Sequence, residues 1–201
     1  MKNIIIFCIV CFSAMVINQI AYSQQNTNQN TEMLVKSNVS TPLDNNTETR
    51  KILEVAEKQI HNFIDDIPEN LMIRFGFNNK EEFKKITFGN PINIYVLENN
   101  NIKSTPEWFI PIIINNEYRT FLTIIEKNGI YQAVGFGSRI LAKNISETKT
   151  NSTYGLLRIY KLNLDFIINE ITENQFKFLS ILKSDNKKYD LVDIINLTKN
   201  N

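Results

Sequence analysis

The segment from residue 92 to residue 134 constrains the fold most strongly, because it combines alternating apolar residues with tight-turn sequences. The apolar residues fall at every second position in two runs: Ile92, Ile94 and Val96, then Trp108, Ile110, Ile112 and Ile114. Asn115-Asn116 can join the second run to a strand at 118–125, and Asn128-Gly129 can join that strand to one at 130–134. Asn-Gly in particular suits the positive φ values of a type I′ turn between antiparallel strands. The segment therefore predicts an antiparallel meander of three or four strands.

A helical pattern precedes the meander. Apolar side chains recur at steps of three and four along residues 50–67, at Ile52, Ala56, Ile60, Phe63 and Ile67. This spacing predicts an amphipathic helix from Arg50 to about Ile67, and Thr49 can cap its N-terminus. Pro68 should end this helix or begin a short second one, and Gly76 is a plausible C-terminal stop.

Two local features refine the boundaries of the predicted elements. Asn78 and Glu81 resemble a capping box, which predicts a short helix over Asn79–Lys85. Pro111 lacks a backbone N–H, so the strand that contains it should be an edge strand or should be bulged there.

The C-terminal third predicts another helix and further strands. Gly135-Phe136-Gly137 should break the last strand of the meander, and Ser138 can cap a helix that runs to about residue 145. Residues 156–168 and 176–182 have the composition of strands, whereas residues 189–197 suit a helix or a strand equally. The predicted fold class is α+β, with N-terminal helices packed on a mainly antiparallel β-meander and a C-terminal strand extension.

Residues 1–23 have the pattern of a signal peptide. Lys2 provides a positive start, Ile4–Ile17 is almost wholly apolar, and Ala21-Tyr22-Ser23 places small residues at the −3 and −1 positions of a cleavage site before Gln24. The apolar run is shorter than the ~20 residues that span a bilayer. We therefore expect an exported protein, secreted or periplasmic, that does not insert in a membrane after cleavage.

Cleavage of the signal would remove Cys8 and Cys11, the only two cysteines. The remaining chain would contain no disulfide, no thiolate nucleophile and no Cys-ligated zinc. It would also lose Lys2, so that 21 Lys and Arg residues balance 21 Asp and Glu residues. A neutral chain gives no electrostatic reason to expect binding to nucleic acid or to an anionic membrane.

The mature chain divides into a tether and one domain. Residues 24–48 are rich in Gln, Asn and Thr and contain few large apolar residues, which predicts a disordered tether. Residues 49–201 have the length of a single domain with one core. No cofactor is expected, because Gly135-Phe136-Gly137-Ser138-Arg139 lacks the third glycine of a dinucleotide fingerprint and no phosphate-binding Gly-Lys-Ser/Thr sequence occurs.

The side chains that most enzymes use are scarce. His61 is the only histidine, and its helical phase directs it to solvent, one turn before Asp65. A single histidine provides no multi-histidine metal site, and no G-x-S-x-G sequence supports a serine nucleophile.

A carboxylate-dependent glycan hydrolase would need neither histidine nor cysteine. However, Asp65-Asp66 and Glu81-Glu82 fall on the polar sides of predicted helices. Asp165 should also face solvent, because by alternation it shares a strand face with Lys161, Asn163 and Asn169.

Three residues are candidates for binding. If residues 156–168 form one strand, Arg158 is the charged residue on its apolar face, and a buried guanidinium needs a carboxylate, a carbonyl or a bound anion. Arg158 could instead extend its head to water, and a break at residues 161–163 would reset the register. Arg139 lies at the start of a predicted helix, where a carboxylate or phosphate can bind. Trp108 is either a core residue or an exposed aromatic contact.

These observations favour a non-catalytic binding module over an enzyme. The expected partner is a protein or a peptide, because the chain has no metal motif, no cofactor motif, no charge excess and a long predicted tether. Two other functions remain open: a carboxylate-dependent glycan hydrolase, and a carrier of a small apolar ligand in a curved sheet.

Overall fold

A computed structural model describes residues 46–148, 155–172, 175–181 and 187–199. The predicted signal peptide, both cysteines and nearly all of the predicted tether lie outside these residues. Within them, no helix is both long enough and apolar enough to cross a membrane.

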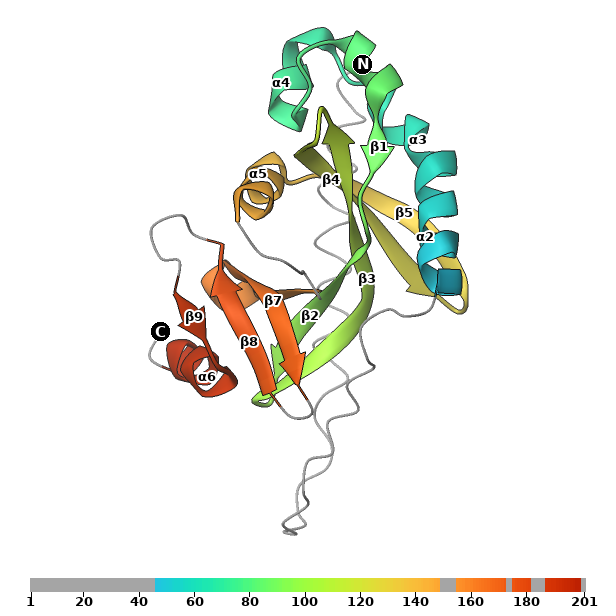
Figure 1. Cartoon of the computed structure of the whole chain (residues 1–201). Helices are drawn as coiled ribbons and strands as arrows, with labels where there is room; N and C mark the ends of the chain where they lie inside the picture. The colour runs from blue at the N-terminus through green and yellow to red at the C-terminus, as the bar shows by residue number, and fades with distance from the viewer. Residues whose placement is uncertain (1–45, 149–154, 173–174, 182–186, 200–201) are drawn as a thin grey trace, which may run out of the picture. The chain divides into compact units, whose positions relative to one another are not determined.

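The N-terminal part of the described chain is helical. It contains the α-helices α2 (Asn46–Gln59), α3 (His61–Ile64) and α4 (Met72–Phe75), with the 3-10 helices η1 (Glu69–Leu71) and η2 (Lys80–Lys85). The other helices are α5 (Arg139–Glu147), η3 (Tyr160–Leu162) and α6 (Leu191–Lys199). Figure 1 shows these helices arranged around a large sheet.

The sheet follows the order β5-β4-β3-β2-β6-β7-β8-β9, and the short strand β1 pairs with β3. Its strands are β1 (Thr87–Phe88), β2 (Ile92–Glu98), β3 (Asn101–Ile114), β4 (Glu117–Lys127), β5 (Ile130–Gly137), β6 (Gly155–Ile159), β7 (Leu164–Thr172), β8 (Gln175–Ser180) and β9 (Lys188–Tyr189). The β2–β6 pair is parallel, and every other described pair is antiparallel. The α+β prediction is therefore confirmed, including the meander and its C-terminal strand extension.

The predicted hairpin turns of the meander are present. Asn115 and Asn116 have φ values of 53° and 63°, and Asn128 and Gly129 have values of 56° and 79°. A third turn of the same kind, at Asn99-Asn100 with φ values of 50° and 63°, joins β2 to β3 and was not predicted. Its sequence carried the same signal, because asparagine tolerates positive φ better than other residues with a side chain.

Pro111 lies in an interior strand, which excludes the edge strand, the first of the two predicted alternatives. On this side of β3, Pro111 lies between the residues that pair with β1 and those that pair with β2. The backbone N–H of Gly89 donates a hydrogen bond of 2.9 Å to the Pro111 carbonyl. The missing N–H of proline therefore faces a gap in the neighbouring strands. The β3–β4 register shifts immediately afterwards, between Ile112 and Ile113, close to the predicted bulge.

The apolar stripe of the first helical region is buried as predicted. Ile52, Ala56, Ile60 and Ile67 are at most 5% exposed, and Phe63 is partly buried. The chain leaves the regular helix at Ile60, and α2 begins at Asn46, so the prediction of Thr49 as the capping residue is wrong.

The short helices that follow end and begin where predicted. Pro68 precedes η1, and Gly76 ends α4 with a φ of 97°. The capping partner of Asn78 is Glu82, not the predicted Glu81, and the helix that follows is a 3-10 helix.

The chain after the meander departs from the prediction in two places. Strand β5 continues through Gly137, and α5 follows the left-handed Ser138, which makes no side-chain capping hydrogen bond. The predicted strand over residues 156–168 is a hairpin, in which η3 and the left-handed Asn163 separate β6 from β7. The ambiguous residues 189–197 are mainly helical, in α6.

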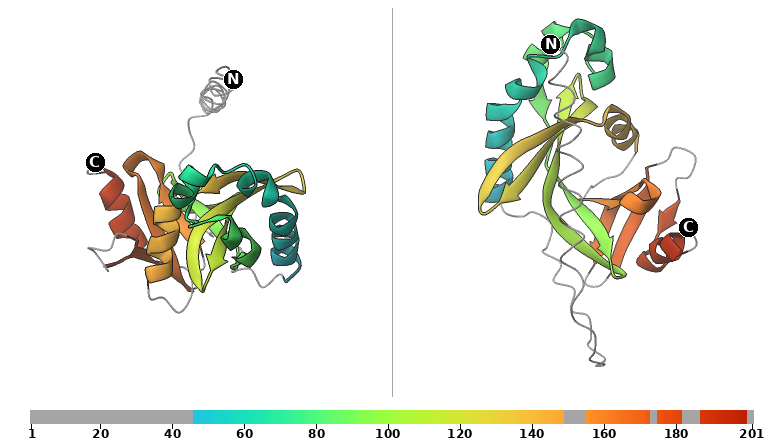
Figure 2. Two further views of the ribbon diagram at one scale, coloured as in Figure 1. Left: turned by 90° about the horizontal axis from the view of Figure 1, so that it is seen from above. Right: turned by 180° about the vertical axis from the view of Figure 1, so that it is seen from behind.

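Alternate residues of β3 face two separate parts of the core. Trp108, Ile110 and Ile112 pack in a cluster with the buried side of α2. Phe109 packs in a second cluster with Phe121 and with residues of α5. Helices α2 and α5 therefore cover opposite faces of this part of the sheet (Figure 2).

Candidate functional site

Two of the predicted binding residues, Arg139 and Arg158, line one pocket of about 600 Å³. We call it the arginine groove. It lies among the α4 residue Arg74, one side of α5, the β6–β7 hairpin and Ile181. Its lining side chains are Arg74, Ser138, Arg139, Ile140, Leu141, Asn144, Arg158, Asn163, Leu164, Asp165 and Ile181. Three guanidinium groups and a single carboxylate therefore share a pocket of ligand-binding size.

Arg158 has the carboxylate partner that its position requires. The β6–β7 hairpin places it directly opposite Asp165, and the Arg158 Nε lies 2.9 Å from Oδ1 of Asp165. The predicted solvent-facing position of Asp165 is wrong, because the hairpin resets the register and leaves only 22% of that side chain exposed. The same change of register was the alternative that the sequence left open for Arg158.

The Arg158 guanidinium is held on two further sides by aromatic rings. Its central carbon lies 5.3 Å from the centroid of the Phe109 ring and 5.6 Å from that of Tyr160. Both distances are within the range of a cation–π contact. Among the described residues, only Asp165 accepts a hydrogen bond from Arg158, and it uses Nε. The two terminal nitrogens are therefore left to solvent or a ligand, on a side chain that is 27% exposed.

A second carboxylate, Glu107, lies close enough to Arg158 to interact with its charge. Burial raises the pKa of Glu107 above its usual value, and the positive charge of Arg158 offsets only part of this effect. Burial likewise raises the pKa of Asp165, despite the ion pair and hydrogen bond with Arg158. The ionised forms of both carboxylates are therefore less favourable in the folded chain than in water.

Replacing Glu107 with glutamine is expected to stabilise the folded protein at neutral pH. Because the pKa of Glu107 is raised on folding, its ionised form costs stability as the pH rises through that pKa, and a neutral amide removes the cost. The gain should shrink as the pH falls below the usual glutamate value of 4.5. Thermal unfolding between pH 3.5 and pH 8 measures it. The exposed Glu57→Gln is the control, and equal curves for the two variants would contradict the expectation.

Arg139 and Arg74 form the other cationic part of the groove. Arg139 Nη1 donates a hydrogen bond of 2.8 Å to the carbonyl of Ile73, the residue next to Arg74. Arg139 thus reaches from the start of α5 to the end of α4. Within the described part of the chain, no carboxylate forms an ion pair with Arg74 or Arg139. Their charges are therefore available to an anion.

Trp108, the third predicted candidate, lies away from the groove. Its side chain is 6% exposed, belongs to the cluster beneath α2 and contacts Tyr131, with 5.6 Å between ring centroids. Trp108 faces the opposite side of β3 from Phe109, whose ring contacts Arg158. It is therefore a core residue, one of the two positions that the sequence allowed.

The remaining candidates for catalysis do not gather in a site. His61 is exposed as predicted, and its Nδ1 lies 3.0 Å from Oδ1 of Asp65, which is also exposed. Glu81 is exposed, but Glu82 is only 8% exposed, so its predicted place on a solvated helix face is wrong. In the described ranges, no group of three or more His, Cys, Asp or Glu side chains could hold a metal ion.

Sequence reasoning missed two residues of the site. Arg74 lies in a short helix without a repeating pattern, and only its exposure and position next to the Arg139 contact mark it as part of the groove. Tyr160 is 62% exposed and lies against the Arg158 guanidinium. The sequence signal for Tyr160 lies in its neighbour Lys161. Residues before Lys161 are nearly all apolar, whereas polar residues alternate with apolar ones after it, and the predicted strand could break at this change.

Comparison of the chain with protein-family models, curated proteins and solved structures finds no match. The arginine groove contains three cations and the apolar side chains Leu141, Leu164 and Ile181, and the exposed Tyr160 ring lies against one of the cations, Arg158. Together these groups suit a ligand with both anionic and apolar parts.

Proposed function

We propose that the protein is an exported, non-catalytic binding module that binds an acidic segment of a protein or peptide partner in the arginine groove. The observation that carries the proposal is the meeting of Arg74, Arg139 and Arg158 from three distant parts of the chain in one pocket. Guanidinium groups recognise carboxylates with planar, paired hydrogen bonds. A peptide brings such carboxylates together with the apolar side chains that the floor of the groove can cover.

The surroundings of the groove support a partner that is larger than an ion. Ile73 and Ile140 are 64% and 77% exposed, and both are next in sequence to arginines of the groove. Tyr160 adds an exposed aromatic surface beside Arg158. Aromatic and arginine side chains are the groups that contribute most to protein-binding surfaces. A partner that touched only the guanidinium groups would leave these apolar side chains in water.

A glycan hydrolase is the second candidate, and one observation favours it. Glu107 and Asp165 are both partly buried carboxylates with raised pKa values, and both interact with Arg158. A raised pKa is what a general acid needs. However, the close ion pair with Arg158 holds Asp165 in a structural role. Loss of glycan turnover in a Glu107→Gln variant, with peptide binding absent, would favour the hydrolase over the binding module.

The binding proposal is tested by fluorescence anisotropy with a labelled peptide of alternating Glu and Leu residues. The unaltered protein should bind it, and the affinity should fall as the salt concentration rises, because the exposed charges are screened. The analogue with Gln in place of Glu should bind at least tenfold more weakly, which is about 1.4 kcal/mol.

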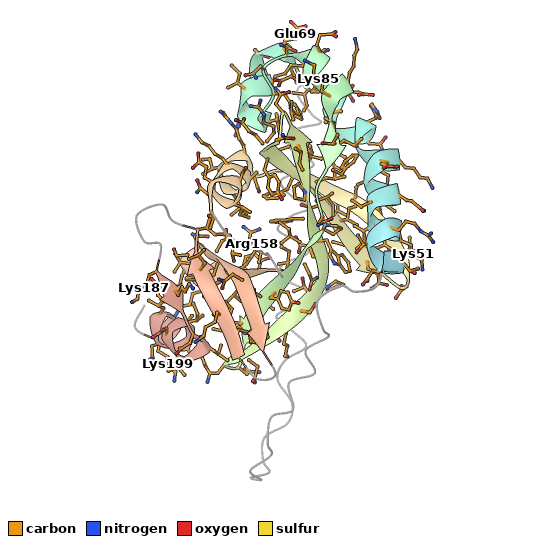
Figure 3. The ribbon with its side chains drawn as sticks, viewed as in Figure 1. Lys51, Glu69, Lys85, Arg158, Lys187 and Lys199 are labelled. Carbon is orange, nitrogen blue, oxygen red and sulfur yellow. The ribbon has the colours of Figure 1, made fainter. Side chains whose placement is uncertain are left out.

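Two variants and one control locate the binding. Arg74→Ala removes an exposed cation without a described ion-pair partner, and Arg158→Met removes the charge while keeping a long apolar side chain. Each should weaken the peptide complex several-fold. Lys51→Ala also removes an exposed positive charge, but from α2, away from Arg158 (Figure 3), and should leave the affinity unchanged. Equal affinities of all three variants would overturn the proposal.

A further inference from the structure

The cations of the arginine groove lie at two separate ends. Helix α4 and the β6–β7 hairpin lie on different sides of α5, both in Figure 1 and in the view from behind in Figure 2. The contact between Arg139 and the Ile73 carbonyl keeps Arg139 close to the Arg74 end. Arg158 stands at the other end, in the hairpin, and Figure 3 shows it beside β7. The groove therefore offers two places for an anion.

The groove also has an apolar floor, formed by Leu141, Leu164 and Ile181, which lies beside the polar side chains of Ser138, Asn144 and Asn163. Ile181 is 5% exposed and belongs to the buried cluster of this face of the sheet, and Leu141 packs against the same cluster. Leu164 begins β7 and also lines the groove. An apolar side chain laid on this floor would lose contact with water, at a gain of about 25 cal/mol for each Å² that is covered.

We propose that the groove binds a peptide segment in which two carboxylate side chains flank an apolar side chain, with one carboxylate at each end of the groove. This inference rests on the proposed function and adds the pattern of the ligand. In an extended peptide every second side chain points the same way, so in the order Glu-x-Leu-x-Glu both carboxylates and the apolar side chain face the groove together.

At the hairpin end, the contacts of Arg158 leave one edge of its guanidinium group for a carboxylate. The Asp165 carboxylate takes the Nε of Arg158, and the Phe109 and Tyr160 rings fix the plane of the guanidinium. The edge formed by the two terminal nitrogens then matches the two oxygens of a carboxylate. Asp165 is a positioning residue here. A lysine in place of Arg158 would keep the charge but could not make the paired hydrogen bonds.

A double-mutant cycle between protein and peptide tests this assignment. The probe is the labelled peptide Gly-Glu-Gly-Leu-Gly-Glu-Gly with both termini blocked, compared with the two peptides in which one Glu is replaced by Gln. Each peptide is titrated against the unaltered protein, Arg74→Ala and Arg158→Lys. Against the unaltered protein, each Glu→Gln change should cost about tenfold in affinity, or 1.4 kcal/mol.

The two arginine variants should respond to different glutamates. The loss of affinity caused by one Glu→Gln change should fall to less than threefold in Arg158→Lys only. The loss caused by the other Glu→Gln change should fall to less than threefold in Arg74→Ala only. Asp165→Asn keeps an oxygen that accepts the hydrogen bond from Nε of Arg158, but it removes a negative charge that competes with the peptide. This variant should therefore bind the peptide about threefold more tightly than the unaltered protein. Replacing the Leu with Ser should weaken binding to all proteins.

The outcomes separate this inference from the proposed function. If the peptide binds and depends on the arginines, but each Glu→Gln change costs the same in every variant, the two-ended pattern is wrong and the binding module stands. If Asp165→Asn weakens binding more than threefold, the Asp165 charge does not compete with a carboxylate of the peptide, and the assignment of the hairpin end is wrong. If no variant changes the affinity for any of the peptides, the proposed function fails as well. Lys51→Ala again serves as the charge-matched control, because Lys51 is exposed on α2.

Discussion

Replacing Glu82 with alanine is expected to destabilise the folded protein by about 3 kcal/mol, since the change leaves several groups without their charged partner. The side chain is 8% exposed. The backbone N–H of Asn78 donates to its Oε2 at 2.7 Å, and Nδ2 of Asn78 donates to its Oε1 at 2.8 Å. Arg119 on β4 lies 3.8 Å from the same Oε1. Glu82 thus joins the loop after α4, the helix η2 and the sheet.

Urea unfolding at neutral pH measures this loss, and the neighbouring residue supplies the control. Glu81 belongs to the same 3-10 helix, but it is exposed and pairs only with the exposed Lys84 among the described residues. Glu81→Ala should therefore leave the stability unchanged within error. A loss below about 1 kcal/mol for Glu82→Ala would show that water replaces the lost hydrogen bonds, and would contradict the structural role.

The destabilisation should depend on pH in a defined direction. Burial alone would raise the pKa of Glu82, but the hydrogen bonds from Asn78 and the charge of Arg119 outweigh burial and lower it. A carboxyl group whose pKa is lowered on folding adds stability above its usual value of 4.5 and loses this contribution as the pH falls through the lowered pKa. The difference between the unaltered protein and Glu82→Ala should therefore narrow in acid.

The parts of the fold that the sequence predicted are those that depend on neighbouring residues. Asn115-Asn116 and Asn128-Gly129 adopt the positive φ values that the turns require, whatever the rest of the chain does. The stripe on the first helical region follows from a regular spacing, and its apolar residues are buried together. Errors in this part were shifts of a few residues, such as the capping partner of Asn78.

The candidate site depended on pairings that no local pattern specifies. Arg158 and Asp165 meet because the chain turns at the left-handed Asn163, whereas a continuous strand would have placed them on opposite faces. The parallel β2–β6 pairing joins segments about 60 residues apart, as in Ile94 with Leu156. Arg158 and Arg139 were recognisable one at a time as charges in unusual positions. Their common groove, with Arg74, is a property of the tertiary fold.

Replacing Gly155 with alanine is expected to destabilise the protein strongly, because Gly155 lies where β6 packs closely against β2. A Cβ at Gly155 would overlap Cε2 of the Tyr95 ring and would lie 2.8 Å from its Cδ2 and 3.0 Å from the Asn93 carbonyl oxygen. Tyr95 is 6% exposed in a packed cluster, and Asn93 is fixed by hydrogen bonds from its Nδ2 to the carbonyls of Thr105 and Glu107. Neither neighbour can move freely, so we expect a loss of about 3 kcal/mol from overpacking.

Gly135→Ala is the matched control for this substitution, because Gly135 also lies in a strand. A Cβ there would meet Thr123 Oγ1 at 3.4 Å and Thr123 Cβ at 3.5 Å, which is ordinary contact. Thermal unfolding of both variants should show a large decrease in unfolding temperature for Gly155→Ala and little change for Gly135→Ala.

Gly155 lies in β6, three residues before Arg158, so displacement of that strand should also move the hairpin end of the groove. We therefore expect Gly155→Ala to weaken peptide binding together with stability. A variant that lost stability and bound the peptide normally would show that the hairpin keeps its geometry independently of the β2–β6 contact.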